Sequence, residues 1–140
     1  MSKMSGLSTV VVLALLAAAP AAAAPVKTKA VIEMITRTSL PGDDAYSAKG
    51  RVTATDDACL SKREVAIYEE LGPPFDGPSL MKVVETDSKG RWKAKWTTRS
   101  GPGNIEESAT GVHYVTVEKL SKGRRKCSFA RSKTYTVPAP

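Results

Sequence analysis

Polar and apolar side chains alternate along most of this chain, the pattern of a β-strand with one buried and one wet face. Between residues 46 and 54, Tyr, Ala, Gly, Val and Ala hold the even positions, and Ser, Lys, Arg and Thr lie between them. The same period fits Val65 and Ile67, flanked by Glu64 and Glu69. It returns in the segment 111–117. Each of these runs is predicted to be a strand of an antiparallel sheet.

Turn-forming residues separate the runs, and no segment beyond residue 23 carries an apolar stripe at helical spacing. A first strand is expected at 29–38 and a last one at 132–137. Gly, Pro, Asp and Ser are concentrated in the predicted loops 40–44, 72–79, 87–90 and 99–104. About seven short strands at this spacing predict an all-β fold, an immunoglobulin-like or transthyretin-like Greek-key sandwich.

Both tryptophans lie in one predicted strand, in the run TDSKGRWKAKW at 86–96. Asp87 and Gly90 belong to its tight turn, where glycine tolerates a positive φ. Alternation then puts the two indoles on one face and the cations on the other. Exposed aromatics for stacking on nucleic acid or sugars are the alternative, which strict alternation disfavours. The predicted core residues are Trp92, Trp96, Val52, Val65, Ile67, Val115 and Val117.

Residues 1–23 have the layout of a secretory signal peptide, with an early Lys3, an apolar stretch and small residues before the expected cut after Ala23. The apolar stretch is short for a membrane span, although an uncleaved anchor is the alternative. We therefore expect a signal-peptide helix, then one β-sandwich domain at 24–140 with its folded core at about 29–138. The mature protein would be secreted or held at the cell envelope, with no transmembrane segment after cleavage.

Cys59 and Cys127 are the only cysteines. In a secreted chain an even pair is typical of a disulfide, and two free thiols are the alternative. Two thiols and a single histidine are too few for a structural metal site. Calcium bound by Asp43, Asp44, Asp56 and Asp57 at one end of the sandwich is the alternative, but their spacing matches no defined calcium loop. No cofactor and no metal are therefore predicted.

The chain is basic, with a formal net charge of +7. Seven cations and no acid lie between Lys119 and Lys133, and 122–126 is expected to be a loop held by the adjacent Cys127. Such a surface favours anionic partners, whereas secretion disfavours a specific nucleic acid. A loop that is merely solvated is the alternative. The predicted contacts for an anionic polymer are Lys122, Arg124, Arg125, Lys126, Arg91, Lys93 and Lys95.

No catalytic constellation emerges from the sequence. His113 is the only histidine, and it lies in phase with Val115 and Val117, so a core role is favoured over a catalytic base. Carboxylates occur as sequence neighbours, such as Glu69–Glu70 and Glu106–Glu107, which point to opposite sides of a strand. A non-enzyme is therefore predicted. A small secreted hydrolase or hydrolase inhibitor is the alternative.

The order of the motifs resembles the carboxypeptidase regulatory-like, or transthyretin-like, β-sandwich superfamily. It runs from GRV (50–52) through REVAIYEE (63–70) and TDSKGRW (86–92) to GVHYVTV (111–117). The cysteine pair and the S-x-T strand at 132–134 also resemble a group of small secreted actinobacterial proteins. His113 departs from the pattern, because the superfamily usually has an inward aromatic there.

The resemblance implies an accessory, adhesive or stabilising module without catalysis. The Lys–Asn crosslink of related adhesins has no suitable partner here, since Asn104 is the only asparagine and lies in a predicted loop. We therefore expect a non-enzymatic binding or structural module. Its expected partner is an anionic cell-envelope polymer or another secreted protein, with self-association as a further alternative.

Overall fold

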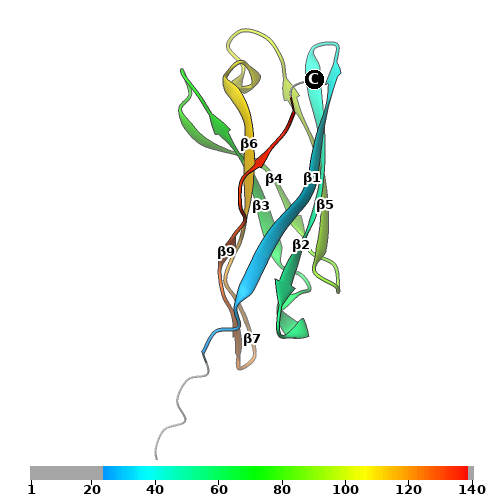
Figure 1. Ribbon diagram of the computed structural model, residues 1–140, viewed down its shortest axis with the longest axis vertical. Helices are drawn as coiled ribbons and strands as arrows, with labels where there is room; N and C mark the ends of the chain where they lie inside the picture. The colour runs from blue at the N-terminus through cyan, green and yellow to red at the C-terminus, as the bar shows by residue number, and fades with distance from the viewer. Residues whose placement is uncertain (1–23, 139–140) are drawn as a thin grey trace, which may run out of the picture.

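Two antiparallel β-sheets pack face to face in the computed structural model, which describes residues 24–138 (Figure 1). The first sheet has the strand order β1 (Thr28–Leu40), β2 (Asp43–Ala54) and β5 (Arg91–Arg99). The second has the order β10 (Tyr135–Thr136), β6 (Ala109–Val117), β3 (Glu64–Leu71) and β4 (Gly77–Glu85), and β9 (Ala130–Arg131) also pairs with β6. A separate hairpin consists of β7 (Leu120–Lys122) and β8 (Arg125–Cys127).

The predicted all-β sandwich is confirmed. The chain crosses between the two sheets after β2, β4 and β5, as in immunoglobulin-like Greek-key sandwiches. Short 3₁₀ turns, η1 (Asp57–Cys59) and η2 (Ile105–Ser108), are the only helical elements between residues 24 and 138. In this range no helix is long and apolar enough to cross a bilayer. The predicted signal peptide at 1–23 lies outside the described residues.

The interior is formed by alternate residues of facing strands. All seven residues predicted for the core are buried, and Trp92 and Trp96 are 2% and 8% exposed. Gly50 lies directly opposite Trp92 on the neighbouring strand. A β carbon at Gly50 would collide with the indole and with the Val31 carbonyl, so only glycine allows the ring to lie over β2. The two tryptophans thus fill the space between the sheets.

Four segments differ from the prediction. The loop expected at 40–44 is reduced to a turn at residues 41 and 42, because β1 reaches Leu40 and β2 begins at Asp43. Residues 77–79, expected in a loop, begin β4, because Leu71 of β3 pairs with Gly77 and an edge strand tolerates Pro78. The basic segment 122–126, also expected to be a loop, is mostly β-hairpin and leaves only residues 123 and 124 as the turn.

Of the expected last strand at 132–137, only β10 at 135–136 forms, and the short β9 at 130–131 precedes it. The cause is Ser132, whose hydroxyl accepts the Val115 N–H at 2.9 Å and donates to the Lys133 carbonyl at 2.9 Å. The Ser132 hydroxyl thereby takes the ladder position of the Ser132 carbonyl, while the Ser132 N–H still donates to the Val115 carbonyl at 2.9 Å. Residues 133 and 134 then leave the sheet.

Candidate anion-binding face

Strand β5 presents a row of three cations on the outer side of the first sheet, with a fourth, Arg99, at its end. Its residues alternate between buried and exposed, with Arg91, Lys93 and Lys95 exposed and both tryptophans buried. The preceding turn fixes this phase. Asp87 Oδ1 accepts the backbone N–H groups of Lys89 and Arg91 at 2.9 Å each, and Gly90 has a φ of +80°.

The register of β2 against β5 adds two cations that the sequence analysis did not select. Lys49 lies directly opposite Lys93, and Arg51 directly opposite Arg91. Alternation already placed Lys49 and Arg51 on the polar side of their strand, but only the pairing shows that they adjoin the cations of β5. We call the set Lys49, Arg51, Arg91, Lys93 and Lys95 the cationic face.

Two acids partly neutralise the cationic face. Arg51 Nε lies 3.7 Å from Glu33 Oε1, and Arg91 Nε lies 3.2 Å from Asp87 Oδ2. Backbone N–H donation from Arg91 lowers the pKa of Asp87, so this carboxylate is charged at neutral pH. Ion pairs between side chains this exposed contribute little free energy, so the two acids reduce the positive charge of the face only in part. Within residues 24–138, no ion pair involves Lys49, Lys93 or Lys95.

A depression of about 350 Å³ lies on this side of the sheet between β1, β2 and β5. Three lysines of the cationic face surround it, together with Met34 and Ser47. The lysine ammonium groups and the serine hydroxyl can all donate hydrogen bonds to an anionic group. The arrangement is thus suited to phosphate or carboxylate oxygens.

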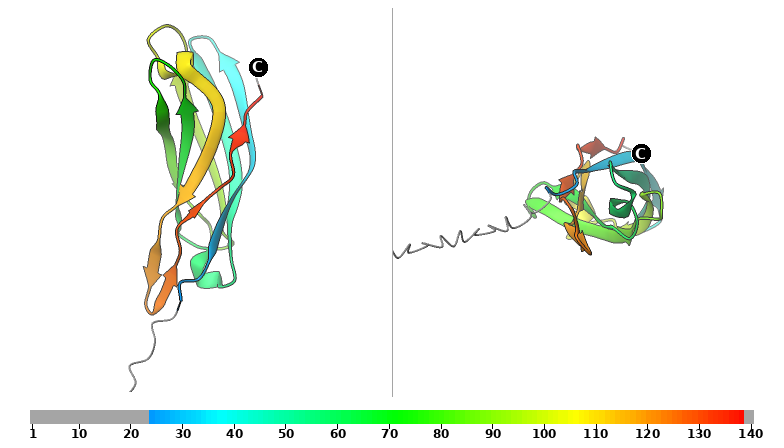
Figure 2. Two further views of the ribbon diagram at one scale, coloured as in Figure 1. Left: turned by 60° about the vertical axis from the view of Figure 1, so that its left-hand side comes forward. Right: turned by 90° about the horizontal axis from the view of Figure 1, so that it is seen from below.

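The other predicted anion contacts lie on the β7–β8 hairpin, at one end of the sandwich (Figures 1 and 2). Arg124 and Lys126 are exposed. Arg125 forms an ion pair with Asp56, and the half-buried Lys122 donates to the carbonyl and hydroxyl oxygens of Ser61 at 3.1 and 3.3 Å. Two of the four hairpin cations thus tie the hairpin to the rest of the domain.

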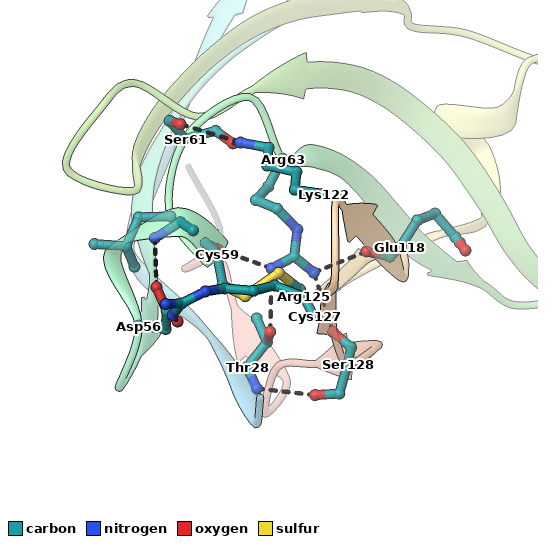
Figure 3. Close-up of a disulfide and its surroundings, with 12 residues drawn as sticks. Thr28, Asp56, Cys59, Ser61, Arg63, Glu118, Lys122, Arg125, Cys127 and Ser128 are labelled. Carbon is teal, nitrogen blue, oxygen red and sulfur yellow. Dashed lines mark hydrogen bonds and ion pairs between the residues drawn. A yellow bond between two sulfur atoms is a disulfide. The ribbon is translucent and has the colours of Figure 1, made fainter. Parts of the chain in front are cut away.

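The predicted disulfide is confirmed. Cys59 of η1 and Cys127 of β8 are bonded, with their Cα atoms 5.6 Å apart (Figure 3). Both cysteines are buried. The bond attaches the hairpin to the loop after β2, and we call this part of the molecule the disulfide end.

A buried arginine, which the sequence analysis did not select, lies beside the disulfide (Figure 3). Arg63 is 1% exposed, and no carboxylate within residues 24–138 pairs with it. Its guanidinium donates to the carbonyls of Cys59 and Glu118 at 2.8 Å each, to that of Ser128 at 3.0 Å, and to the Thr28 hydroxyl at 3.1 Å. Arg63 therefore joins four separate segments at the disulfide end.

In the part of the interior nearer η2, at the middle of β6, His113 meets Glu69. The two residues are register partners, are 0% and 1% exposed, and place Nε2 and Oε1 3.0 Å apart. The contact is not aligned for a straight hydrogen bond, and Glu69 Oε2 has no partner among the residues that the structure describes. The prediction of Glu69 as a polar flank is wrong: it points inward because it shares the phase of Val65 and Ile67.

The hydrogen bonds of His113 bear on the hydrolase alternative. Nδ1 lies 3.0 Å from the Gly111 carbonyl, which can only accept, so Nδ1 carries a proton. Nε2 faces Glu69 Oε1 at 3.0 Å, without the alignment of a hydrogen bond. The ring is fully buried between these neighbours, whereas a catalytic base needs a nitrogen within reach of substrate.

A second carboxylate holds η2 against this end of the sandwich. Glu106 accepts hydrogen bonds from Tyr46 Oη and Thr98 Oγ1, each at 2.6 Å, and lies 3.3 Å from Arg37 Nη1. Burial and the bond to Glu106 raise the pKa of Tyr46. Tyr46 in turn stacks on Trp96, with ring centres 5.1 Å apart. We call this region the η2 end.

The described part of the chain contains no group of three or more His, Cys, Asp or Glu side chains arranged to hold a metal ion. Comparisons of the chain with protein-family models, with curated proteins and with solved structures give no match. Any function of the cationic face therefore has to be inferred from its charges and its geometry.

Proposed function

We propose that this chain is a secreted, non-enzymatic β-sandwich module that binds anionic polymers of the cell envelope through the cationic face. One observation carries the proposal. Lys49 lies opposite Lys93 and Arg51 opposite Arg91, and like charges directly opposite each other destabilise a sheet. Folding gains nothing from this repulsion, whereas a bound polyanion would relieve it.

The shape and charge of the face agree with a polymeric ligand. Residues two apart on a strand are about 7 Å apart, so β5 offers a row of three cations to successive groups of an extended chain. The summed positive potential would also speed the encounter with a polyanion. Salt should weaken such binding by screening.

The test is retention on immobilised polyphosphate and polyglutamate over a range of salt concentrations. The face variant, Lys49→Gln with Lys93→Gln, is compared with a hairpin variant, Arg124→Gln with Lys126→Gln. Each removes two positive charges, so net charge cannot explain a difference. We expect salt-sensitive retention of the wild type, at least tenfold weaker affinity for the face variant, and little change for the hairpin variant.

Thermal unfolding of both variants accompanies the binding test. The face variant should be at least as stable as the wild type, because a like-charge pair has been removed. Wild-type retention that ignores salt would refute the proposal. Equal loss in both variants would refute the assignment to this face.

A further inference from the structure

A groove separates β1 from the last part of the chain. The two segments run together only briefly, where Val26 N–H donates to the Lys126 carbonyl at 2.7 Å and Ser128 N–H to the Val26 carbonyl at 2.9 Å. The contact ends at Thr28, whose N–H donates to Ser128 Oγ. Beyond it, β1 pairs with β2 alone, and β9 and β10 pair with β6 alone. Free edges of both sheets therefore border each other, as both side views show (Figures 1 and 2).

The groove between these edges has a volume of about 400 Å³. Val31, Ile32 and Tyr135 contribute apolar, half-buried surface, and Ile32 and Tyr135 pack on the hydrophobic core. The interruption after Ser132 opens this space, because residues 133 and 134 leave the ladder of β6. The result is an apolar channel at the seam of the sandwich.

The border of the groove is cationic from both sides. Lys29 comes from β1, and Arg131 and Lys133 come from the last part of the chain; all three are exposed. No acidic residue lines the groove, and none of the three forms an ion pair within residues 24–138. The Arg131 guanidinium lies 4.0 Å from the centre of the Tyr114 ring, which fixes its position.

We propose that this seam groove binds a small anionic amphiphile. The apolar tail would lie along Val31, Ile32 and Tyr135, and the carboxylate or phosphate group would be held by Lys29, Arg131 and Lys133. The volume is within the range of small-molecule sites. The lining covers four residues of β1, about 10 Å along the strand, which suits a medium-length acyl chain better than a peptide strand.

The seam groove differs from the cationic face in the property that the ligand must have. The cationic face offers charge on a polar surface, whereas the groove combines charge with an apolar floor. A tail without charge, or charge without a tail, should therefore bind the groove poorly. This proposal does not depend on the proposed function.

The first experiment titrates the full chain with decanoate, methyl decanoate, acetate and decyl phosphate, and follows binding by calorimetry and two-dimensional NMR. We expect decanoate to bind at least tenfold more tightly than its methyl ester or acetate. The shifted amide signals should cluster at Val31, Ile32 and Tyr135. Decyl phosphate reports whether the phosphate head of a lipid is accepted as well as a free carboxylate; tight binding of either charged probe supports the site.

The second experiment uses Lys29→Gln with Lys133→Gln, and the face variant Lys49→Gln with Lys93→Gln as a control of equal charge change. The groove variant should bind decanoate at least tenfold more weakly, whereas the control should bind it as the wild type does. All four side chains are outside the core, so circular dichroism and thermal unfolding should remain close to those of the wild type.

Three results would overturn the proposal. One is equal affinity for decanoate and its uncharged ester, and another is a set of shifted amides away from the seam. The third is a preference for acidic peptides with no measurable binding of decanoate or decyl phosphate at millimolar concentration.

Discussion

The two ends of the interior bury charge in different ways. At the disulfide end the Arg63 guanidinium donates mainly to backbone carbonyls. At the η2 end Glu69 faces His113, so each charge-bearing group has a side chain as its partner. Backbone carbonyls remain in place whatever the side chains are, so they still need a donor after Arg63 is replaced. Glu69 and His113 are both side chains, so the two polar groups can be removed together by substitution.

The largest expected effect is that of Arg63→Met. The change leaves three carbonyls without this donor, one buried and two partly buried, at roughly 1–3 kcal/mol each. We expect the free energy of unfolding to fall by about 5 kcal/mol, measured by urea denaturation. Arg63→Lys keeps the charge but has fewer donors in a less suitable geometry, and should recover only part of the loss.

The disulfide is the control for this experiment. Thiol titration of the Met variant must find no free thiol, so that the loss is assigned to the guanidinium and not to an open Cys59–Cys127 bond. A loss below about 1 kcal/mol, the contribution of one ordinary hydrogen bond, would contradict the assignment.

The intermediate effect distinguishes the two ends directly. Glu69→Leu or His113→Phe alone leaves one polar group buried without its partner, and each should cost about 3 kcal/mol. The double variant replaces both groups with apolar side chains of similar size. It should therefore return to within about 1 kcal/mol of the wild type, or exceed it.

A double-mutant cycle gives the coupling between the two residues as the measured quantity. Additive losses in the double variant would mean that the cost arises from packing and not from the pair. The η2 end would then resemble the disulfide end, and the contrast between replaceable and fixed partners would fail.

Much of the fold could be predicted from alternation, because a two-residue period tells which side chains share a face. That period was enough to bury Trp92 and Trp96. It also applies to Arg63 and Glu69, which share the phase of Val65 and Ile67 and could have been recognised as inward.

The residues that contact them could not be predicted in this way, because the sequence of one strand does not determine its register against the neighbouring strand. The Glu69–His113 pair, the carbonyls around Arg63 and the Lys49–Lys93 contact all depend on how separate strands align. The interruption at Ser132 likewise depends on a side chain that competes with the backbone of another strand. The cationic face was therefore predicted only in part, from the strand that carries the tryptophans.

The smallest expected effect concerns Tyr46, which links the η2 end to the aromatic core. Tyr46→Phe removes the hydrogen bond to Glu106 and should cost about 2 kcal/mol at neutral pH, as expected for a hydrogen bond to a charged group. Burial raises the pKa of Tyr46, so the folded state favours the protonated phenol. This stabilisation is fully present below the unfolded pKa of about 10 and is lost as the pH rises above it.

The difference in stability between wild type and Tyr46→Phe should therefore stay constant from neutral pH to about pH 9 and shrink above pH 10. Denaturation at a series of pH values measures it. Tyr135→Phe is the matched control, because no hydrogen bond of the Tyr135 hydroxyl is found in the described chain, and its curve should run parallel to that of the wild type. A stability difference for Tyr46→Phe that persists unchanged to pH 12 would show that the stabilisation by Tyr46 does not depend on its hydroxyl proton. Glu106 would then be held to the sandwich mainly by Arg37 and Thr98, and the η2 end would owe its order to this largely buried ion pair and not to the phenol.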